Sequence, residues 1–394
     1  MLEDNVIPGL EHRISQLNLL FRHCTPSQLE KLWTQMQAPL PELVGLYLSF
    51  EGLAFSYAAP IPVIPDSFLG GSAPRLLHLD LNQLNGIVFP GLPKILLSCT
   101  HMAKLHLRNI PFFGYISPET MATCLSTLTS LESLHLGFEY KEFHPNRKSR
   151  PPFPPTRIVL PALKKFQFTG VIKYFKRFVA RIDAPQLYRL STTFRNDIDF
   201  GASEITQFIS RTPTFGTCDE ARFIFDQDGV LLGLCQSHSE ASDRRMAEVK
   251  LLFPDRQLST LAQIYTSLLR PASAIENIYI YEVQYPRLRW KDDIENTEWL
   301  DLLLSFTAVK NLYVSKQIAP RIATALQEIT EGGTTEVLST LEKFYLEGLQ
   351  ENHHLEELEG IEQFISARQL TNPPVAISAW HRTKKSSHWR WDES

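Results

Sequence analysis

Apolar residues recur along this chain in one short pattern, which is clearest at residues 131–136. The sequence there reads Leu-Glu-Ser-Leu-His-Leu, so an anchoring leucine is followed by two leucines that alternate with polar residues. Alternation places Leu134 and Leu136 on one face of a β-strand, with Ser133 and His135 on the other. One such strand cannot bury its apolar face, so the pattern predicts that several copies stack side by side.

The same L-x-x-L-x-L pattern, with any aliphatic residue or phenylalanine allowed, recurs in order along most of the chain. Its copies start at Ile14, Leu43, Leu76, Met102, Leu131, Leu163, Leu187, Cys218, Met246, Ile275, Val309 and Leu341. Successive starts are 24 to 34 residues apart, which is long for leucine-rich repeats of about 20–29 residues. Twelve ordered copies favour a repeat array over an unrelated α/β domain.

The segments between the copies have helical spacing instead. Ile172, Phe175, Phe178 and Ile182 form one apolar stripe, and similar stripes follow other copies. Ser117 before Pro118 is typical of a helix start. Parallel strands need a crossover, usually a helix. We therefore expect an α/β leucine-rich-repeat solenoid of about twelve irregular repeats, with a parallel sheet on the concave face and helices on the convex face.

The pattern also predicts how the chain is organised. We expect an N-terminal cap with the first repeat at 1–40, the solenoid at 41–350, a C-terminal cap at 351–380 and a disordered tail at 381–394. A solenoid needs such caps because an open end would expose its core. Two insertions are expected inside the solenoid, a basic, proline-rich loop at 142–155 and a hairpin at 221–235.

Composition narrows the ligand classes and the cellular compartments that we expect for this protein. The 394 residues carry a net charge of −4, which gives no overall attraction to nucleic acid or anionic membranes. The five cysteines show no C-x-x-C pair, which is typical of reduced thiols in a cytoplasmic or nuclear protein. No apolar run approaches the ~18 residues of a membrane span, so we expect no membrane partner.

No residue pattern in the sequence predicts catalysis. The chain has no G-x-S-x-G, P-loop, G-x-G-x-x-G or H-E-x-x-H motif. Asp226, Asp228 and Gly229 match the start of a calcium loop, but the later ligand positions fail, so a turn is favoured. His353 and His354 are adjacent and cannot face one ion from a helix. We expect no enzyme, no cofactor, no metal and no catalytic residue.

The outward positions of the strands are more informative than these motifs. Tyr279, Tyr313 and Tyr345 share one position in three successive repeats and should stack as an exposed row. Tyrosine is a preferred anchor at protein interfaces. The row, with the neighbouring residues, is our first candidate for partner binding; it comprises Tyr279, Tyr281, Tyr313, Tyr345, Asn277 and Asn311. The alternative is that the tyrosines only stabilise adjacent strands as aromatic pairs.

A second candidate patch is basic. Lys104, His106 and Arg108 are outward positions of one repeat, and His78 and His135 hold outward positions in the flanking repeats. The patch could meet an acidic partner, and the alternative is an ordinary solvated face. Basic residues also gather in the 142–155 loop and in the tail, which contains Trp389 and Trp391. Nucleic-acid binding through the loop and tail is a further, less favoured alternative.

Three stretches carry a resemblance to a known family. They resemble the leucine-rich-repeat region of F-box proteins from basidiomycete fungi. The first is the opening, with residues 11–19 (EHRISQLNL), 28–30 (QLE) and 36–43 (MQAPLPEL), and the second is the set of strand copies. The third is the ending, residues 361–370 (IEQFISARQL) with Pro374–Ile377. The resemblance covers most of the chain, although its motifs are loose. It implies an adaptor that binds a cullin-RING ubiquitin ligase through an N-terminal F-box and holds a target on its repeats.

The chain departs from that family at its start. An F-box is a helical module of about fifty residues that precedes the repeats, whereas the copies here begin at Ile14. Leu40-Pro-Glu-Leu43 imitates an F-box opening but continues as a repeat strand. We expect protein–protein recognition of an unknown target, either as the target-reading part of an F-box-type adaptor or as a repeat-only scaffold unrelated to ubiquitin. The cullin-RING core is an expected partner only if an F-box lies upstream.

Overall fold

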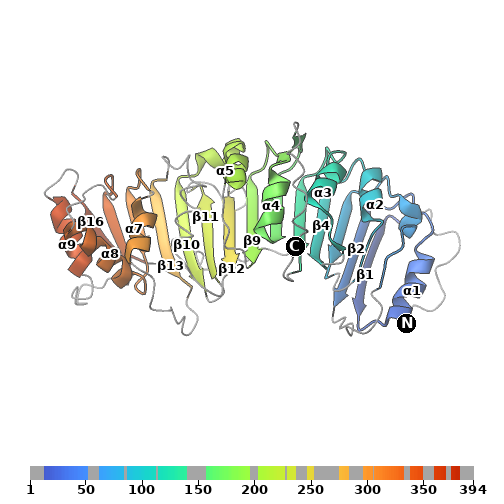
Figure 1. Cartoon of the computed structure of the whole chain (residues 1–394), viewed down its shortest axis with the longest axis horizontal. Coiled ribbons are helices and arrows are strands. Elements are labelled where there is room, and N and C mark those ends of the chain that lie inside the picture. The colour runs from blue at the N-terminus through green and yellow to red at the C-terminus, as the bar shows by residue number, and fades with distance from the viewer. Residues whose placement is uncertain are drawn as a thin grey trace, which may run out of the picture. The chain divides into compact units, whose positions relative to one another are not determined.

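The computed structural model describes most of the chain. The described ranges are 13–51, 62–83, 87–111, 114–139, 157–195, 203–226, 229–236, 246–252, 275–283, 296–304, 306–331, 338–348, 359–369 and 374–381. The chain forms two compact units, an N-terminal unit of residues 1–195 and a C-terminal unit of residues 196–394. Figure 1 labels their elements.

The N-terminal unit is built on a parallel sheet whose strands lie in sequence order. Its strands are β1 (Gln16–Arg22), β2 (Gly45–Glu51), β3 (His78–Asn82), β4 (Lys104–Ile110), β5 (Ser133–Phe138), β7 (Lys165–Gly170) and β9 (Arg189–Arg195). A separate short pair consists of β6 (Ile158–Val159) and β8 (Ile182–Asp183). The expected helical stripe therefore ends before Ile182, which lies in β8, because the preceding helix stops at Val179.

Helices connect these strands. They are α1 (Pro26–Gln35), the 3-10 turn η2 (Phe68–Gly71), α2 (Leu92–Ser98), α3 (Pro118–Leu125) and α4 (Ile172–Val179). Ser117 caps α3 as expected, since its hydroxyl accepts a hydrogen bond from the Thr120 amide at 3.1 Å. Thr25 caps α1 in the same way within a capping box.

The core of the N-terminal unit is a ladder of apolar side chains. One residue from each of six successive strands lies opposite the next: Leu46, Leu79, Leu105, Leu134, Phe166 and Leu190. All six are 0–1% exposed. The alternating pattern thus points every second side chain into the core. The strand positions between them form what we call the open face, the side of the sheet opposite the helices.

The C-terminal unit contains a mixed sheet. Its strands, in spatial order, are β12 (Met246–Leu252), β11 (Gly229–Cys235), β10 (Glu220–Asp226), β13 (Asn277–Glu282), β14 (Asn311–Val314), β15 (Lys343–Glu347) and β16 (Ala376–Trp380). Pairing is parallel from β10 through β13 to β16, but β11 runs antiparallel to both β10 and β12. The antiparallel pair of β10 and β11 lies where the sequence places a hairpin, at 221–235.

A tight turn reverses the chain between β10 and β11. The Asp226 side chain accepts a hydrogen bond from the Gly229 amide at 2.7 Å. A Cβ on Gly229 would lie 1.9 Å from the Leu251 carbonyl oxygen of β12, so only glycine fits this close approach. Asp226 thus serves a turn, and it also pairs with Lys250 at 2.8 Å.

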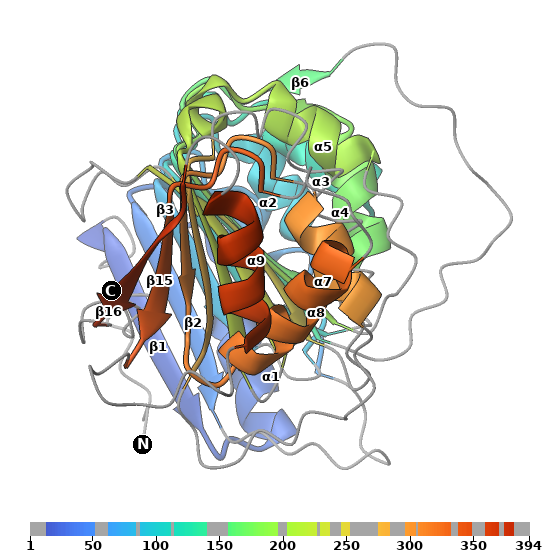
Figure 2. The ribbon, with the colours of Figure 1, turned by 90° about the vertical axis from the view of Figure 1, so that its left-hand side faces the viewer.

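Helices flank the C-terminal sheet. They are α5 (Ser203–Ser210), the 3-10 turn η4 (Pro213–Thr217), α7 (Asn296–Leu304), α8 (Ala319–Glu331) and α9 (Glu359–Gln369). Figure 2 shows α7, α8 and α9 on one side of β15 and β16. The opposite side is the open face of this unit.

Each of the twelve predicted strands is present, and the leucine-rich-repeat fold with parallel repeat strands is confirmed. The basic loop expected at 142–155, most of the expected tail at 381–394 and the pair His353–His354 lie outside the described residues.

Candidate recognition surfaces

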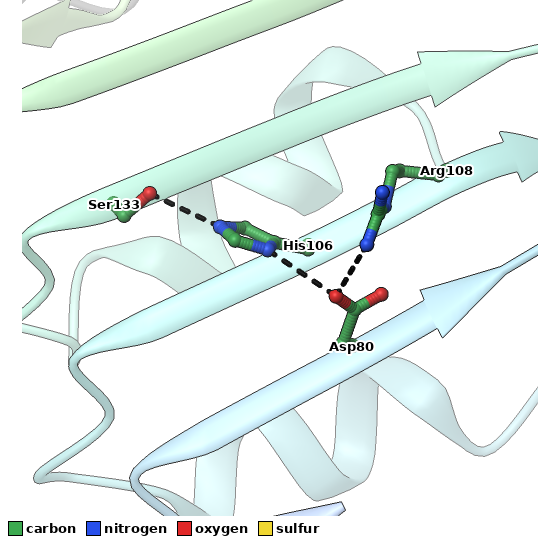
Figure 3. Close-up of polar contacts among 4 residues, drawn as sticks. All are labelled: Asp80, His106, Arg108 and Ser133. Carbon is green, nitrogen blue, oxygen red and sulfur yellow. Dashed lines mark hydrogen bonds and ion pairs between the residues drawn. The ribbon is translucent and has the colours of Figure 1, made fainter. Parts of the chain in front are cut away.

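A polar network lies at the centre of the open face of the N-terminal unit (Figure 3). Asp80 of β3, His106 of β4 and Ser133 of β5 come from three neighbouring strands. The Nδ1 atom of His106 lies 3.4 Å from Oδ2 of Asp80, and its Nε2 atom lies 3.1 Å from the Ser133 hydroxyl. Arg108 donates to the same Asp80 oxygen at 2.6 Å.

Burial and charge set the protonation states in this network. Burial raises the pKa of Asp80, but hydrogen bonds from His106 and Arg108 outweigh it and hold the pKa below its usual value. Burial, together with the positive charges of His106 and Arg108, lowers the pKa of His135 to about 3. Asp80 is therefore ionised and His135 neutral at neutral pH.

The order carboxylate, imidazole, hydroxyl also occurs in serine hydrolases, but two contacts here differ from those of a catalytic triad. Here Asp80 is shared with Arg108, and its contact with His106, at 3.4 Å, is the longer of the two. The Ser133 amide donates to the Ala103 carbonyl at 3.1 Å, so it is not available to stabilise an oxyanion. This arrangement fits a network that positions side chains on a surface better than a nucleophile.

Some residues of the predicted basic patch contact one another or Asp80, whereas Lys104 remains exposed. His106 and Arg108 are engaged with Asp80, and His135 packs its ring against the edge of His106 with centroids 6.1 Å apart. Lys104 is exposed and makes no ion pair with any described residue. Sequence reasoning did not single out Asp80 and Ser133. The repeat spacing could have identified them, because Asp80 and Ser133 lie 26 and 27 residues from His106, one repeat away on each side.

The predicted tyrosine row lies on the open face of the C-terminal unit. Tyr279 of β13, Tyr313 of β14 and Tyr345 of β15 occupy one register. Their rings stack with centroids 4.2 Å and 4.3 Å apart and interplanar angles of 9° and 5°. Stacking covers both faces of Tyr313, and all three tyrosines are only partly exposed, so the row is less exposed than the sequence predicted.

The last strand adds an aromatic residue that the sequence analysis did not select. The Trp380 ring lies 5.7 Å from Tyr313, 5.9 Å from Tyr279 and 6.2 Å from Tyr281, centroid to centroid. Tyr281 was expected to contact a partner, but it is only 2% exposed. The signal for Trp380 was its alternation in β16, which places it opposite Glu347 on the open face.

Polar groups hold the other end of the row. The Arg222 guanidinium lies 5.1 Å from the Tyr279 ring centroid and pairs with the buried Glu220. Burial, with the nearby charge of Glu220, raises the pKa of Tyr279. The predicted asparagines also meet, since Asn311 Nδ2 donates to Asn277 Oδ1 at 2.9 Å. The row is therefore fixed before any partner arrives.

The described residues show no metal-binding cluster and no membrane-spanning helix. They contain no group of three or more histidine, cysteine, aspartate or glutamate side chains placed to hold a metal ion. No helix in the described part of the chain has the length and apolar character needed to cross a membrane. All five cysteines are free thiols.

Comparisons with known proteins give no match by sequence and a structural similarity of low TM-score. No family model and no curated protein matches the chain. A solved structure of the leucine-rich repeat-containing protein LegL7 from Legionella pneumophila is similar over 92% of this chain and 90% of that chain, with 12% sequence identity and a TM-score of 0.34. The assignment of the leucine-rich-repeat fold therefore rests on this chain's own strand register and alternating burial.

Proposed function

We propose that this protein recognises another protein through the open face of its repeats, with the tyrosine row as the main anchor. The observation that carries the proposal is the stack of Tyr279, Tyr313 and Tyr345 on the side of the sheet opposite the helices. Solenoids use this kind of extended surface for binding. The proposed mechanism is non-covalent recognition of the partner, without catalysis, cofactor or metal.

The chemistry of the row supports a protein partner. Each tyrosine offers apolar area at a low entropic cost and a hydroxyl that can donate or accept a hydrogen bond. The stack, the Asn277–Asn311 pair and Trp380 hold the rings in place. Little ordering is then required on binding, which favours affinity.

Quantitative capture of partners from the source cell tests the proposal. The triple variant Tyr279→Ala, Tyr313→Ala, Tyr345→Ala should lose at least about 30-fold in affinity for a captured partner, because interface anchors contribute about 2 kcal/mol or more each. The triple Tyr→Phe variant keeps the stack and loses only hydroxyl contacts, so it should lose less. Retention of every partner by the alanine variant would refute the anchor assignment.

A helix-side variant provides the control. Thr324→Ala changes an exposed position of α8, on the other side of the C-terminal sheet. It should bind as the unaltered chain does. Circular dichroism and thermal unfolding of every variant separate a loss of binding from a loss of folding.

The finer proposal is that this recognition serves an F-box-type ubiquitin ligase adaptor in the cytoplasm or nucleus of a fungus. The resemblance of residues 11–19, 36–43 and 361–370 supports it, as do the five free cysteines. Co-purification of the endogenous protein with a cullin-RING ligase core tests this part. Partner capture without the ligase core would favour the repeat-only scaffold.

A further inference from the structure

Five polar side chains, four of them basic, share one register position across the open face of the N-terminal unit. His78, Lys104, Ser133, Lys165 and Arg189 lie opposite one another on successive strands β3, β4, β5, β7 and β9. We call these five residues the cationic row. Neighbouring strands are about 4.8 Å apart, so the row spans about 19 Å. The repeat register therefore gathers charges that are scattered through more than a hundred residues of sequence.

The charges at the centre of the row are not cancelled by neighbours. Lys104 and Lys165 are exposed, and neither makes an ion pair with a described residue. The nearby carboxylates are already engaged, Asp80 with Arg108 at 2.6 Å and Glu132 with Lys164 at 2.8 Å. Two exposed lysines without an ion-pair partner among the described residues favour an anionic ligand.

The shape of the row selects an extended ligand. A polypeptide in extended conformation places same-side groups about 6.6 Å apart, a spacing that flexible lysine side chains two strands apart can follow. The Ser133 hydroxyl lies between the two lysines and can hydrogen-bond a neutral group of such a ligand. His106, held by Asp80, fixes the orientation of that hydroxyl.

We propose that the cationic row binds an acidic segment of a partner protein, laid across strands β3 to β9 with anionic side chains on Lys104 and Lys165. The inference rests on the proposed function in one respect, namely that the partner is a protein. It concerns the N-terminal unit and a different chemistry from that of the tyrosine row.

Nucleic acid is the competing anionic ligand, and the row lacks what it needs. Binding of single strands relies on aromatic side chains on which bases stack, and the row contains no phenylalanine, tyrosine or tryptophan. The ionised Asp80 also lies beside the row, where it would repel a continuous phosphate backbone. A peptide with spaced anionic side chains avoids that contact.

Fluorescence anisotropy with the full chain tests the inference. The probe is a fluorescein-labelled peptide of about eight residues that alternates glutamate and serine, long enough to span the row. A glutamine–serine peptide is the neutral control, and a peptide with phosphoserine in place of glutamate distinguishes phosphate from carboxylate as the preferred anion. An oligothymidylate of similar length tests nucleic acid.

The double variant Lys104→Glu, Lys165→Glu should weaken binding of the glutamate–serine peptide about 10-fold or more, because two attractions become repulsions. Lys104→Gln with Lys165→Gln should weaken it by a smaller factor. The matched control is Lys343→Glu, which alters an exposed lysine on the open face of the C-terminal unit. Binding of the peptide to the unaltered chain should also weaken between ~50 mM and ~200 mM salt.

Several results would overturn the inference. The first is equal binding of the glutamine–serine and glutamate–serine peptides. The second is unchanged affinity in the Lys104→Glu, Lys165→Glu variant, or a loss in Lys343→Glu as large as in that variant. The third is tighter binding of oligothymidylate than of the glutamate–serine peptide, abolished by the Lys104→Glu, Lys165→Glu variant. The triple Tyr→Ala variant should bind the acidic peptide normally. Failure of the cationic row therefore leaves the tyrosine row untested by this assay, and failure of the tyrosine row leaves this inference standing. Thermal unfolding shows whether each variant is folded.

Discussion

The two units share one kind of apolar core, the wall of buried strand side chains, and they differ in the side chains on the open face of the sheet. In both, most of the alternate strand residues are buried apolar side chains, such as Leu134 in β5 at 1% exposed and Leu312 in β14 at 0%. On the open face, the N-terminal unit carries histidines and cations around Asp80. The C-terminal unit carries stacked tyrosines covered in part by Trp380.

The difference shows how register converts sequence into chemistry. Parallel strands place equivalent positions side by side, so identical residues in successive repeats stack, as the three tyrosines do. Different residues at equivalent positions form networks instead, as Asp80 and His106 do. The wall sets where side chains lie, and the outward residues decide whether the surface attracts charge or aromatic and apolar groups.

The largest expected effect tests whether the two walls are equivalent. Leu134→Ala and Leu312→Ala should each lower the free energy of unfolding by about 2–5 kcal/mol, because each removes buried methyl groups and leaves a cavity. Chemical denaturation of the full chain measures the loss. Leu97→Ala is the control, since Leu97 in α2 is 47% exposed and should cost less than ~0.5 kcal/mol. A large loss in only one unit would break the equivalence.

The wall was predictable from the sequence because it depends on local alternation. Each repeat supplies its own pattern, and twelve copies leave one architecture that buries them all. The hairpin of β10 and β11 was predictable in place from Gly229 and its polar neighbours. The pairing of β11 with β12 was not predictable in the same way, because the pattern of alternation is the same for a strand of either direction.

The candidate sites were predictable only in part. The tyrosine row followed from one shared position, and the rings do stack. Engagement of His106 and Arg108 by Asp80 depends on side-chain reach across strands, which alternation does not report. Burial of Tyr281 under Trp380 depends on the last strand docking in register with β15, about a hundred residues later.

The pH dependence of stability distinguishes the N-terminal unit, whose open face carries the partly buried His135, from the C-terminal unit. In the folded chain the pKa of His135 is about 3, whereas an unfolded histidine titrates near 6.5. Below that pH the unfolded chain binds a proton that the folded chain rejects, so stability falls as pH falls, by up to ~1.4 kcal/mol per pH unit. His135→Gln should flatten this fall between about pH 6 and pH 4.5, as measured by denaturation at each pH.

The comparison separates His135 from the groups beside it. Asp80 loses its negative charge only at lower pH, because its pKa is held below the usual value. His106, whose ring lies 6.1 Å away, remains in both proteins and cancels in the difference. His101→Gln, at an exposed position, should leave the slope unchanged. An unchanged slope in His135→Gln would mean that His135 is solvated.

The smallest expected effect concerns the cover over the aromatic face. Trp380 is only partly buried at the edge strand, so Trp380→Ala should cost about 1–2 kcal/mol of unfolding free energy, the value of its aromatic contacts. It should also expose the Tyr281 hydroxyl, which raises the rate of Tyr281 nitration measured by mass spectrometry. Trp380→Phe should retain part of the cover. If nitration of Tyr281 is unaffected by Trp380→Ala, the C-terminal face is closed by other contacts, and Trp380 does not distinguish the two faces.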